Sequence, residues 1–272
     1  MAAGAGMNPR SSRAASSRYE FKYHVEESLA RAVARAARTW YDRDPHLPPG
    51  QSEYVITSLY LDTPRMDFYK DRVSQRFDRI KARIRTYGPR NEGPVFLEIK
   101  RRFGDTMVKS RAHVPTDLWT SALVPGFQDF SSWGLTHSRE KVVLDFAGMC
   151  SARSLRPVVS VRYDREAYVG RMSPDLRLTF DRRLRYMPVG NVTLPPHDRD
   201  YRLMDSGTLF AGSQSLVVME VKFTGRHPLW MEDLLAQFDL QRRSFSKYIV
   251  AVDAMQSEAD TSCPGARRSW VV

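Results

Sequence analysis

The sequence has 272 residues, of which 42% are hydrophobic and 27% are charged, a composition typical of a globular protein that can bury a core. Its 42 Lys and Arg residues outnumber its 31 Asp and Glu residues, and the net charge of +11 predicts an anionic partner. The two cysteines, Cys150 and Cys263, lack the spacing of metal ligands, and no apolar run reaches membrane-spanning length. These features exclude a zinc-binding motif and a transmembrane helix, and they predict a reduced, cytoplasmic protein.

The sequence lacks the motifs that are typical of several function classes. The sequence contains no helix-turn-helix, zinc-knuckle or RRM signature, and its basic residues alternate along predicted strands, so no nucleic-acid partner is expected. It also lacks a G-x-S-x-G element, a P-loop and any paired histidine motif, which argues against acyl transfer and Walker-type nucleotide hydrolysis.

The chain begins with an Ala-, Gly-, Ser- and Arg-rich stretch, residues 1–17, whose composition predicts a disordered leader. A strand at 18–23 is followed by an amphipathic helix at 25–41, whose acidic N-terminus and basic C-terminus suit the helix dipole. Alternation of apolar and charged residues then predicts strands at 53–61, 78–87, 94–102, 106–114, 157–169, 175–183 and 216–224.

The remaining segments are less regular. Residues 116–155 show irregular helical spacing and are expected to cap the sheet. Residues 185–213 fit either a loop or a long hairpin, and 245–254 fit either a final helix or a strand end. We expect one domain over 18–254 and a loose, polar tail over 255–272.

The strand I-K-A-R-I-R-T (80–86) places Lys81, Arg83 and Arg85 on one face and three apolar residues on the other. Neighbouring charges roughly 6.8 Å apart repel by about 0.6 kcal/mol in water but by about 2.4 kcal/mol at an effective dielectric of 20. The row is therefore tolerable on an open surface, whereas an enclosed site needs a polyanion to offset it.

The same alternation recurs in five other strands. The charged faces carry Glu20 and Lys22, Glu98 and Lys100, Lys109 and Arg111, Arg177 and Asp181, and Glu220 and Lys222. An ordinary antiparallel sheet with one solvated face also alternates, but its wet face would mix Ser, Thr, Gln, Glu and Lys. The dominance of Lys and Arg favours a shared basic cavity.

An ordered set of motifs carries a family resemblance. The set comprises S-L-Y-L-D-T (58–63), K-A-R-I-R (81–85), L-E-I-K (97–100), K-S-R (109–111), V-R-Y (161–163), L-T-F-D (178–181), M-E-V-K-F (219–223) and S-F-S-K-Y (244–248). In this order they resemble the VTC catalytic domain, a polyphosphate polymerase branch of the triphosphate tunnel metalloenzymes (CYTH-like superfamily), over about residues 18–254. The resemblance implies an α+β fold, an antiparallel β-barrel that forms a tunnel, with helices packed outside.

The resemblance further implies a metal-dependent phosphotransferase that moves the γ-phosphoryl group of ATP onto inorganic phosphate or polyphosphate. Arg and Lys supply the donors that such a phosphate chain needs. The expected phosphate-binding residues are Lys22, Lys81, Arg83, Arg85, Lys100, Lys109, Arg111, Arg162, Arg177, Lys222, Ser246 and Lys247. The expected catalytic residues among them are Lys22, Arg83, Arg85, Lys100, Arg162 and Lys222.

Mn²⁺ or Mg²⁺ is the expected cofactor, because these ions combine one or two carboxylates with phosphate oxygens. The family's metal ligand maps to Glu220, and Glu98 is the second expected ligand. For Glu98 an equally strong alternative is an ion pair across strands with Lys100 or Arg111.

One position departs from the hydrolytic members of the superfamily, which begin with E-x-E-x-K. Here the string is R-Y-E-F-K, so Arg18 replaces the first acid and the case for hydrolysis is weaker. A triphosphatase and a non-catalytic polyphosphate- or nucleotide-binding module remain as alternatives. Fungal relatives add membrane segments, so a membrane partner outside this chain is also compatible with the resemblance.

Overall fold

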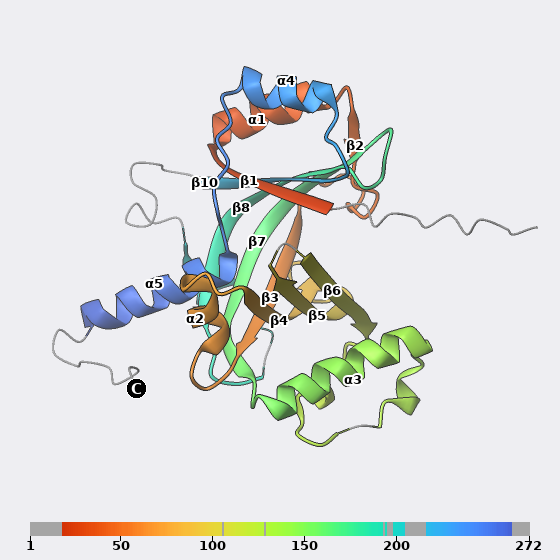
Figure 1. Ribbon diagram of the computed structural model, residues 1–272, viewed down its shortest axis with the longest axis vertical. Coiled ribbons are helices and arrows are strands. Elements are labelled where there is room, and N and C mark those ends of the chain that lie inside the picture. The colour runs from red at the N-terminus through yellow and green to blue at the C-terminus, as the bar shows by residue number, and fades with distance from the viewer. Residues whose placement is uncertain are drawn as a thin grey trace, which may run out of the picture.

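The computed structural model describes residues 18–104, 106–127, 129–192, 194, 198–204 and 216–262 (Figure 1). The expected leader, 1–17, and the end of the expected tail, 263–272, lie outside these described residues. The strands are β1 (Arg18–Glu26), β2 (Tyr41–Arg43), β3 (Tyr54–Asp62), β4 (Asp78–Tyr87), β5 (Val95–Phe103), β6 (Thr106–Val114), β7 (Arg156–Gly170), β8 (Arg177–Pro188), β9 (Arg202–Leu203) and β10 (Leu216–Thr224).

These strands form one antiparallel sheet that curls into a half-barrel. Its order is β1-β10-β8-β7-β3-β4-β5-β6, with β2 paired to β7 and β9 paired to β8. The first strand of the chain thus pairs with the last one, and β1 and β6 lie at the two ends of the pairing order. This confirms the expected α+β fold with a barrel-like antiparallel sheet.

The helices are α1 (Glu27–Ala37), α2 (Asp67–Val73), α3 (His137–Ala152), α4 (Leu229–Gln237) and α5 (Lys247–Ser262), with short 3₁₀ turns at Trp119–Leu123, Ser131–Trp133 and Asp198–Asp200. The pair α1 and α4 covers β1 and β10, while α3 lies against β5 and β6 (Figure 1). Among the described helices, none combines the length and the apolar character that crossing a membrane requires.

Helix α1 illustrates how the sequence selects these elements. Its Ala-rich sequence has high helix propensity, and the residues that face the sheet, among them Ala30, Val33 and Ala37, are buried. Arg31 lies on the opposite side, where it forms an i,i+4 ion pair with Glu27 at 2.8 Å. The expected helix at 25–41 is confirmed with narrower bounds, since β1 continues to Glu26.

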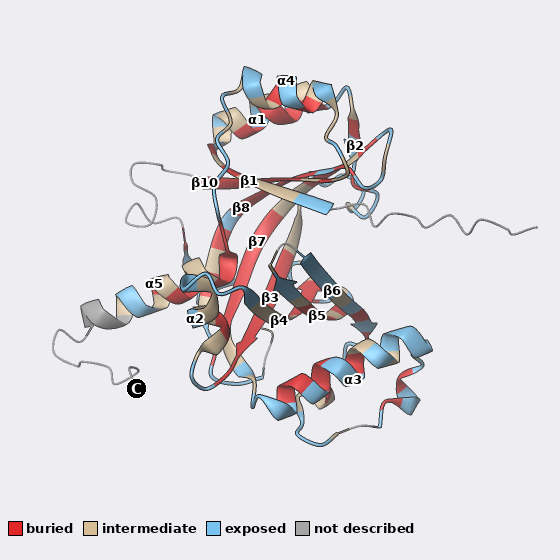
Figure 2. Ribbon diagram, viewed as in Figure 1, coloured by how far each residue is buried: buried red, intermediate tan, exposed pale blue. Residues whose placement is uncertain are grey.

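Three apolar clusters hold the fold together. One lies between β4, β5, β6 and α3, and a second between β1, β8, β10 and the pair α1 and α4. The third lies on the inner side of the curl, where α5 packs on β3 and β7 through residues such as Tyr60, Val161 and Tyr248. Figure 2 shows buried residues along β7 and β10, whereas β6 is exposed over most of its length.

A β-bulge in β8 changes which residues face inward. Arg162 of β7 pairs with Arg185, and Asp164 pairs with Arg182, so two steps along β7 face three along β8. The additional residue is Arg183, which adopts a left-handed backbone with φ of 48°. Beyond it the inner face of β8 becomes apolar and contacts α5.

The segments whose sequences were ambiguous are partly described. Of the segment 245–254, residues 247–254 belong to helix α5, which continues to Ser262, so the tail expected from residue 255 starts within this helix. In 185–213, β8 runs to Pro188, a 3₁₀ turn covers Asp198–Asp200, and β9 is a two-residue strand. The other parts of this segment, 193, 195–197 and 205–213, lie outside the described residues.

Candidate functional site

Charged side chains gather on the inner face of the half-barrel, which we call the charged cluster. Its basic members are Lys22, Lys81, Arg83, Arg85, Lys100, Lys109, Arg111, Arg165, Lys222 and Lys247. Its acidic members are Glu20, Glu98, Asp181 and Glu220. Basic side chains outnumber acidic ones more than twofold, so the cluster is strongly cationic.

Glu220 lies at the centre of one half of the cluster. The register of β1 and β10 places Lys22 opposite Glu220 and Glu20 opposite Lys222. Lys222 Nζ lies 2.7 Å from a Glu220 carboxylate oxygen, and Lys22 Nζ lies 3.5 Å from the other. Lys247 at 3.6 Å and Arg165 at 3.7 Å complete a ring of four cations.

Two carboxylates of this half, Glu220 and Glu20, are ionised at neutral pH. Burial alone would raise the pKa of Glu220, but the surrounding cations, Lys222 foremost, hold this pKa well below its ordinary value. Glu20 also experiences burial and the repulsion of Glu220, yet Lys22 and other lysines lower its pKa to about 2. Both carboxylates are therefore anions that are available to bind a cation.

Glu98 organises the other half of the cluster. It is 2% exposed, and Arg83 contacts it at 2.5 Å. Lys109 at 3.1 Å and Arg111 at 3.3 Å approach the other carboxylate oxygen. Burial would raise the pKa of Glu98, but these cations keep it far below the ordinary range. Both oxygens are thus engaged by cations, and Arg111 is one of the two partners that the sequence suggested.

Lys100 does not contact Glu98. Its Nζ lies 3.5 Å from a carboxylate oxygen of Glu20 and so joins β5 to β1. Since β1 and β6 end the pairing order, this side-chain contact links one edge strand, β1, to the strand next to the other edge.

Neutral hydroxyl groups position Arg85, which is 7% exposed. Its guanidinium donates to Ser58 Oγ at 3.1 Å and to Tyr163 Oη at 3.1 Å. Within the described part of the chain Arg85 forms no ion pair, and the charge of Glu98 acts on it only from beyond ion-pair distance. A buried guanidinium of this kind is well suited to bind an incoming anion.

Lys81 is a second basic side chain that forms no ion pair within the described residues. Its Nζ donates to Ser246 Oγ at 2.8 Å, and no carboxylate of the described residues forms an ion pair with it. Burial, followed by the positive charges of Lys22 and Lys100, lowers the pKa of Lys81 well below its ordinary value. An anion bound beside Lys81 would reverse this effect and restore the protonated form.

The N-terminus of α5 brings Ser246 and Lys247 into the cluster. Lys247 Nζ lies 2.5 Å from Asp181, and Lys22 Nζ donates to the carbonyl oxygen of Phe245 at 3.0 Å. Tyr248 fixes the helix by donating from its hydroxyl to Asp62 at 2.5 Å. The S-F-S-K-Y motif thus enters the half-barrel as the start of a helix.

Two expected site residues lie apart from the cluster. Arg162 is on the opposite face of β7, where it pairs with Asp198 at 2.5 Å and also donates to the carbonyl oxygen of Pro89. Arg177 is on the inner face at the start of β8, but it is exposed, and the carbonyl oxygen of Pro174 accepts its hydrogen bond at 3.4 Å. The structure therefore does not bring either arginine into contact with Glu220 or Glu98.

Sequence reasoning also overlooked members of the site. Arg165 forms an ion pair with Asp181 at 2.6 Å, and Tyr60 accepts a hydrogen bond from Arg83 at 3.3 Å. Alternation along β7 offered a signal for Arg165, since it shares a face with Tyr163. Glu20 and Asp181 were recognised as charged-face residues but not as site residues.

The carboxylates fit a divalent cation only together with further ligands. Across the described residues no group of three or more His, Cys, Asp or Glu side chains is close enough to hold a metal by itself. Glu20 and Glu220 share Lys22 as a partner and provide hard oxygen ligands. One or two carboxylates completed by phosphate oxygens and waters is the set that Mg²⁺ prefers, so these residues fit such an ion.

Lys109 gives the site a pH dependence. Desolvation lowers the pKa of Lys109 to about 8, although Glu98 partly offsets it. The amine is therefore charged below pH 8 and neutral above it, and we expect the affinity for tripolyphosphate to fall as pH rises from 7 to 9. Calorimetric titration across this range measures the effect.

The matched control for this prediction compares two lysine substitutions. Lys109→Gln should weaken binding at pH 7 and reduce the fall between pH 7 and 9, whereas the exposed Lys141→Gln should leave the fall unchanged. An identical pH profile in the wild type and in Lys109→Gln would show that another group titrates.

Comparisons with known proteins place this geometry in context. The solved structure of the PH1819 protein from Pyrococcus horikoshii OT3 is similar with a TM-score of 0.43 and 12% sequence identity, covering 87% of this chain and 99% of that chain. The curated proteins contain no match. The family model of the VTC domain matches residues 17–256. Because this match spans most of the sequence, the chain belongs to the VTC domain family.

Proposed function

We propose that this protein is a metal-dependent phosphotransferase that extends polyphosphate with the γ-phosphoryl group of ATP. Membership of the VTC domain family supports a polyphosphate-related role. The observation that carries the proposal concerns two basic side chains on the inner face, the half-buried Lys81 and the buried Arg85. Neither forms an ion pair within the described part of the chain, whereas Glu98 and Glu220 are both ion-paired. A linear polyanion supplies the charge that these side chains lack.

The chemistry proposed for this site is an in-line transfer. An oxygen of the acceptor phosphate attacks the γ-phosphorus, a new P–O bond forms, and the bond between the γ-phosphorus and the β,γ-bridging oxygen breaks to release ADP. The acceptor is already anionic at neutral pH, so no side chain has to remove a proton. The protein contributes positioning and compensation of charge, tasks for which Arg83, Arg85 and Lys81 are placed.

Glu220 and Glu20 are the residues proposed to hold Mn²⁺ or Mg²⁺. Such an ion would supply positive charge that neutralises the phosphate groups. Lys22 and Lys222 keep both carboxylates ionised and in place for this task. Glu98, whose oxygens are taken by three cations, is proposed to position Arg83 for phosphate contact.

Arg18 favours transfer to phosphate over hydrolysis. It lies at the start of β1, opposite Thr224, and alternation places it on the same face as Glu20 and Lys22. A hydrolase needs an acceptor for the proton of an attacking water, and a guanidinium cannot fill that role.

The product distribution tests the proposal. Incubation of the protein with ATP labelled at the γ-position and Mn²⁺, followed by separation of products by size, should yield chains longer than triphosphate with free phosphate as a minor product. Lys81→Met should lower chain synthesis by about a hundredfold, because it removes a cation aimed at developing phosphate charge.

The control variant is Arg35→Met, which removes an exposed cation on the outer surface of α1 and should leave synthesis unchanged. Free phosphate as the sole labelled product would replace the polymerase with a triphosphatase. Binding of tripolyphosphate without any turnover of ATP would instead identify a non-catalytic binding module.

A further inference from the structure

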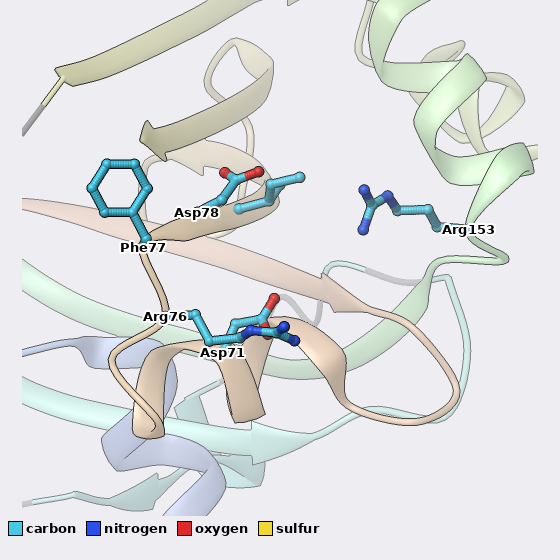
Figure 3. Close-up of a pocket in the computed structure, with 6 residues that line it drawn as sticks. Asp71, Arg76, Phe77, Asp78 and Arg153 are labelled. Atoms are coloured by element: carbon cyan, nitrogen blue, oxygen red, sulfur yellow. The ribbon is translucent and has the colours of Figure 1, made fainter. Parts of the chain in front are cut away.

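A surface pocket of about 400 Å³ lies outside the charged cluster, between α2, the start of β4 and the end of α3 (Figure 3). Its lining residues are Asp71, Arg76, Phe77, Asp78, Ile80 and Arg153. A volume of this size lies within the range of pockets that hold small molecules, roughly 300–1,000 Å³.

The pocket exists because β4 loses one of its neighbours there. The pairing of β3 with β4 ends at Leu61 and Ala82, so the first residues of β4 pair with β5 alone. Helix α2 borders the gap, and Asp62 fixes its N-terminus by accepting hydrogen bonds from the backbone N–H groups of Phe68 and Tyr69, each at 2.9 Å. The helix is fixed at its N-terminus and the start of β4 lacks a second neighbouring strand, so an opening remains between them.

The pocket carries an aromatic wall. Phe77 is 64% exposed and packs edge to face against Phe103, which is 63% exposed, with ring centroids 4.7 Å apart. The ring of Phe77 lies over Gly104, where a Cβ atom would come within 2.5 Å of it. Gly104 thus allows the ring to hold this position. An exposed, fixed ring is typical of a platform for base stacking.

Polar groups line the other sides of the pocket, and in Figure 3 the Phe77 ring lies on the side away from Arg153. Figure 3 shows Arg153 extending from the end of α3 toward the start of β4, where Asp78 lies. Within the described part of the chain neither Asp78 nor Arg153 forms an ion pair, and Arg76 contacts Asp71 only at 3.5 Å. A few polar groups that are available beside an aromatic ring suit a ligand with both donors and acceptors, such as a nucleobase and its ribose.

The pocket adjoins the phosphate-binding row through β4. Ile80 faces the pocket, whereas the next residue, Lys81, faces the charged cluster. Arg79 precedes them on the same face as Lys81, and burial together with the charges of Arg102 and Arg72 lowers its pKa. Four residues of β4 span only roughly 10 Å from Asp78 to Lys81. The cationic row therefore reaches the edge of the pocket.

We propose that this pocket binds the nucleoside of the phosphoryl donor, with its base on Phe77 and its triphosphate passing the start of β4 to reach Lys81. This inference rests on the proposed function, since it assumes that a nucleoside triphosphate is the donor. It adds the means by which the protein distinguishes ATP from inorganic polyphosphate.

Calorimetric binding of ATP and of tripolyphosphate separates the two parts of the proposal. Phe77→Ala should weaken ATP binding about tenfold, because one base–aromatic stack contributes roughly 1–3 kcal/mol, and it should leave tripolyphosphate binding unchanged. Phe77→Tyr, which keeps an aromatic ring, should bind ATP as the wild type does.

Leu229→Ala is the matched control, since Leu229 is 77% exposed on α4 and lies apart from both sites. Equal affinities for ATP in the wild type and in Phe77→Ala, with tripolyphosphate binding intact, would overturn the nucleoside pocket and leave the proposed function standing. Failure of the wild type to bind either compound would overturn both.

Discussion

Glu220→Gln should lower metal-dependent turnover of ATP by about a hundredfold or more, which is the scale of losing a group that acts on transition-state charge. The amide keeps the shape of the side chain but removes the negative charge that Lys22, Lys222, Lys247 and Arg165 surround. A neutral amide is a poor ligand for Mn²⁺ or Mg²⁺ compared with a carboxylate.

The same substitution should have the opposite effect on binding without metal. Removing one anion from the cluster increases its positive charge, so tripolyphosphate should bind several-fold more tightly to Glu220→Gln in the presence of a chelator. Calorimetry and the product gel measure the two effects, and circular dichroism monitors folding. This pair of opposite changes separates a lost metal ligand from a lost fold.

Glu92→Gln is the control, because Glu92 is an exposed carboxylate that faces Arg90 at 4.0 Å. It should change neither binding nor turnover. Normal turnover by Glu220→Gln at the Mn²⁺ concentration that saturates the wild type would remove Glu220 from the metal site.

The second large effect concerns the pair of Arg83 and Glu98. Arg83→Met should lower the free energy of unfolding by about 3 kcal/mol, because it removes the nearest of the cations that compensate the buried charge of Glu98. This value is at the low end for a broken buried pair, since Lys109 and Arg111 still face Glu98. Urea unfolding measures it.

The double variant Arg83→Met/Glu98→Met separates stability from function. Replacing both charges with apolar side chains should recover most of the lost stability, whereas tripolyphosphate binding should stay weak because the guanidinium is missing. Arg90→Met, which breaks an exposed pair, should cost less than about 1 kcal/mol. Recovery of binding in the double variant would mean that Arg83 serves the fold alone.

The strands and most of the charged faces could be predicted because alternation is local. The observed β4 has the predicted bounds, 78–87, and Lys81, Arg83 and Arg85 lie on one face as expected. The fold class followed from the same pattern together with the ordered motifs. These features depend on residues two positions apart, which a single sequence displays directly.

The partners of each charge could not be predicted, because they depend on the register of distant strands. No local pattern indicates that Lys22 lies opposite Glu220 or that Lys100 contacts Glu20. Arg162 was misplaced for a related reason. Around Arg162 the inward face of β7 is apolar, with Val161 and Tyr163, because α5 occupies that part of the interior. A rule that equates the charged face with the inner face fails there.

The pairing of β1 with β10 also determines when the site can form during folding. Lys22 and Phe245, which contact one another, are 223 positions apart in the chain, and Tyr248 and Asp62 are 186 apart. Contacts at such separations form slowly, because the chain must lose the entropy of closing a long loop before the contact can stabilise the fold. An emerging polypeptide therefore completes Glu220's ring of cations only after nearly all of the domain has left the ribosome, and a C-terminally shortened chain cannot assemble it.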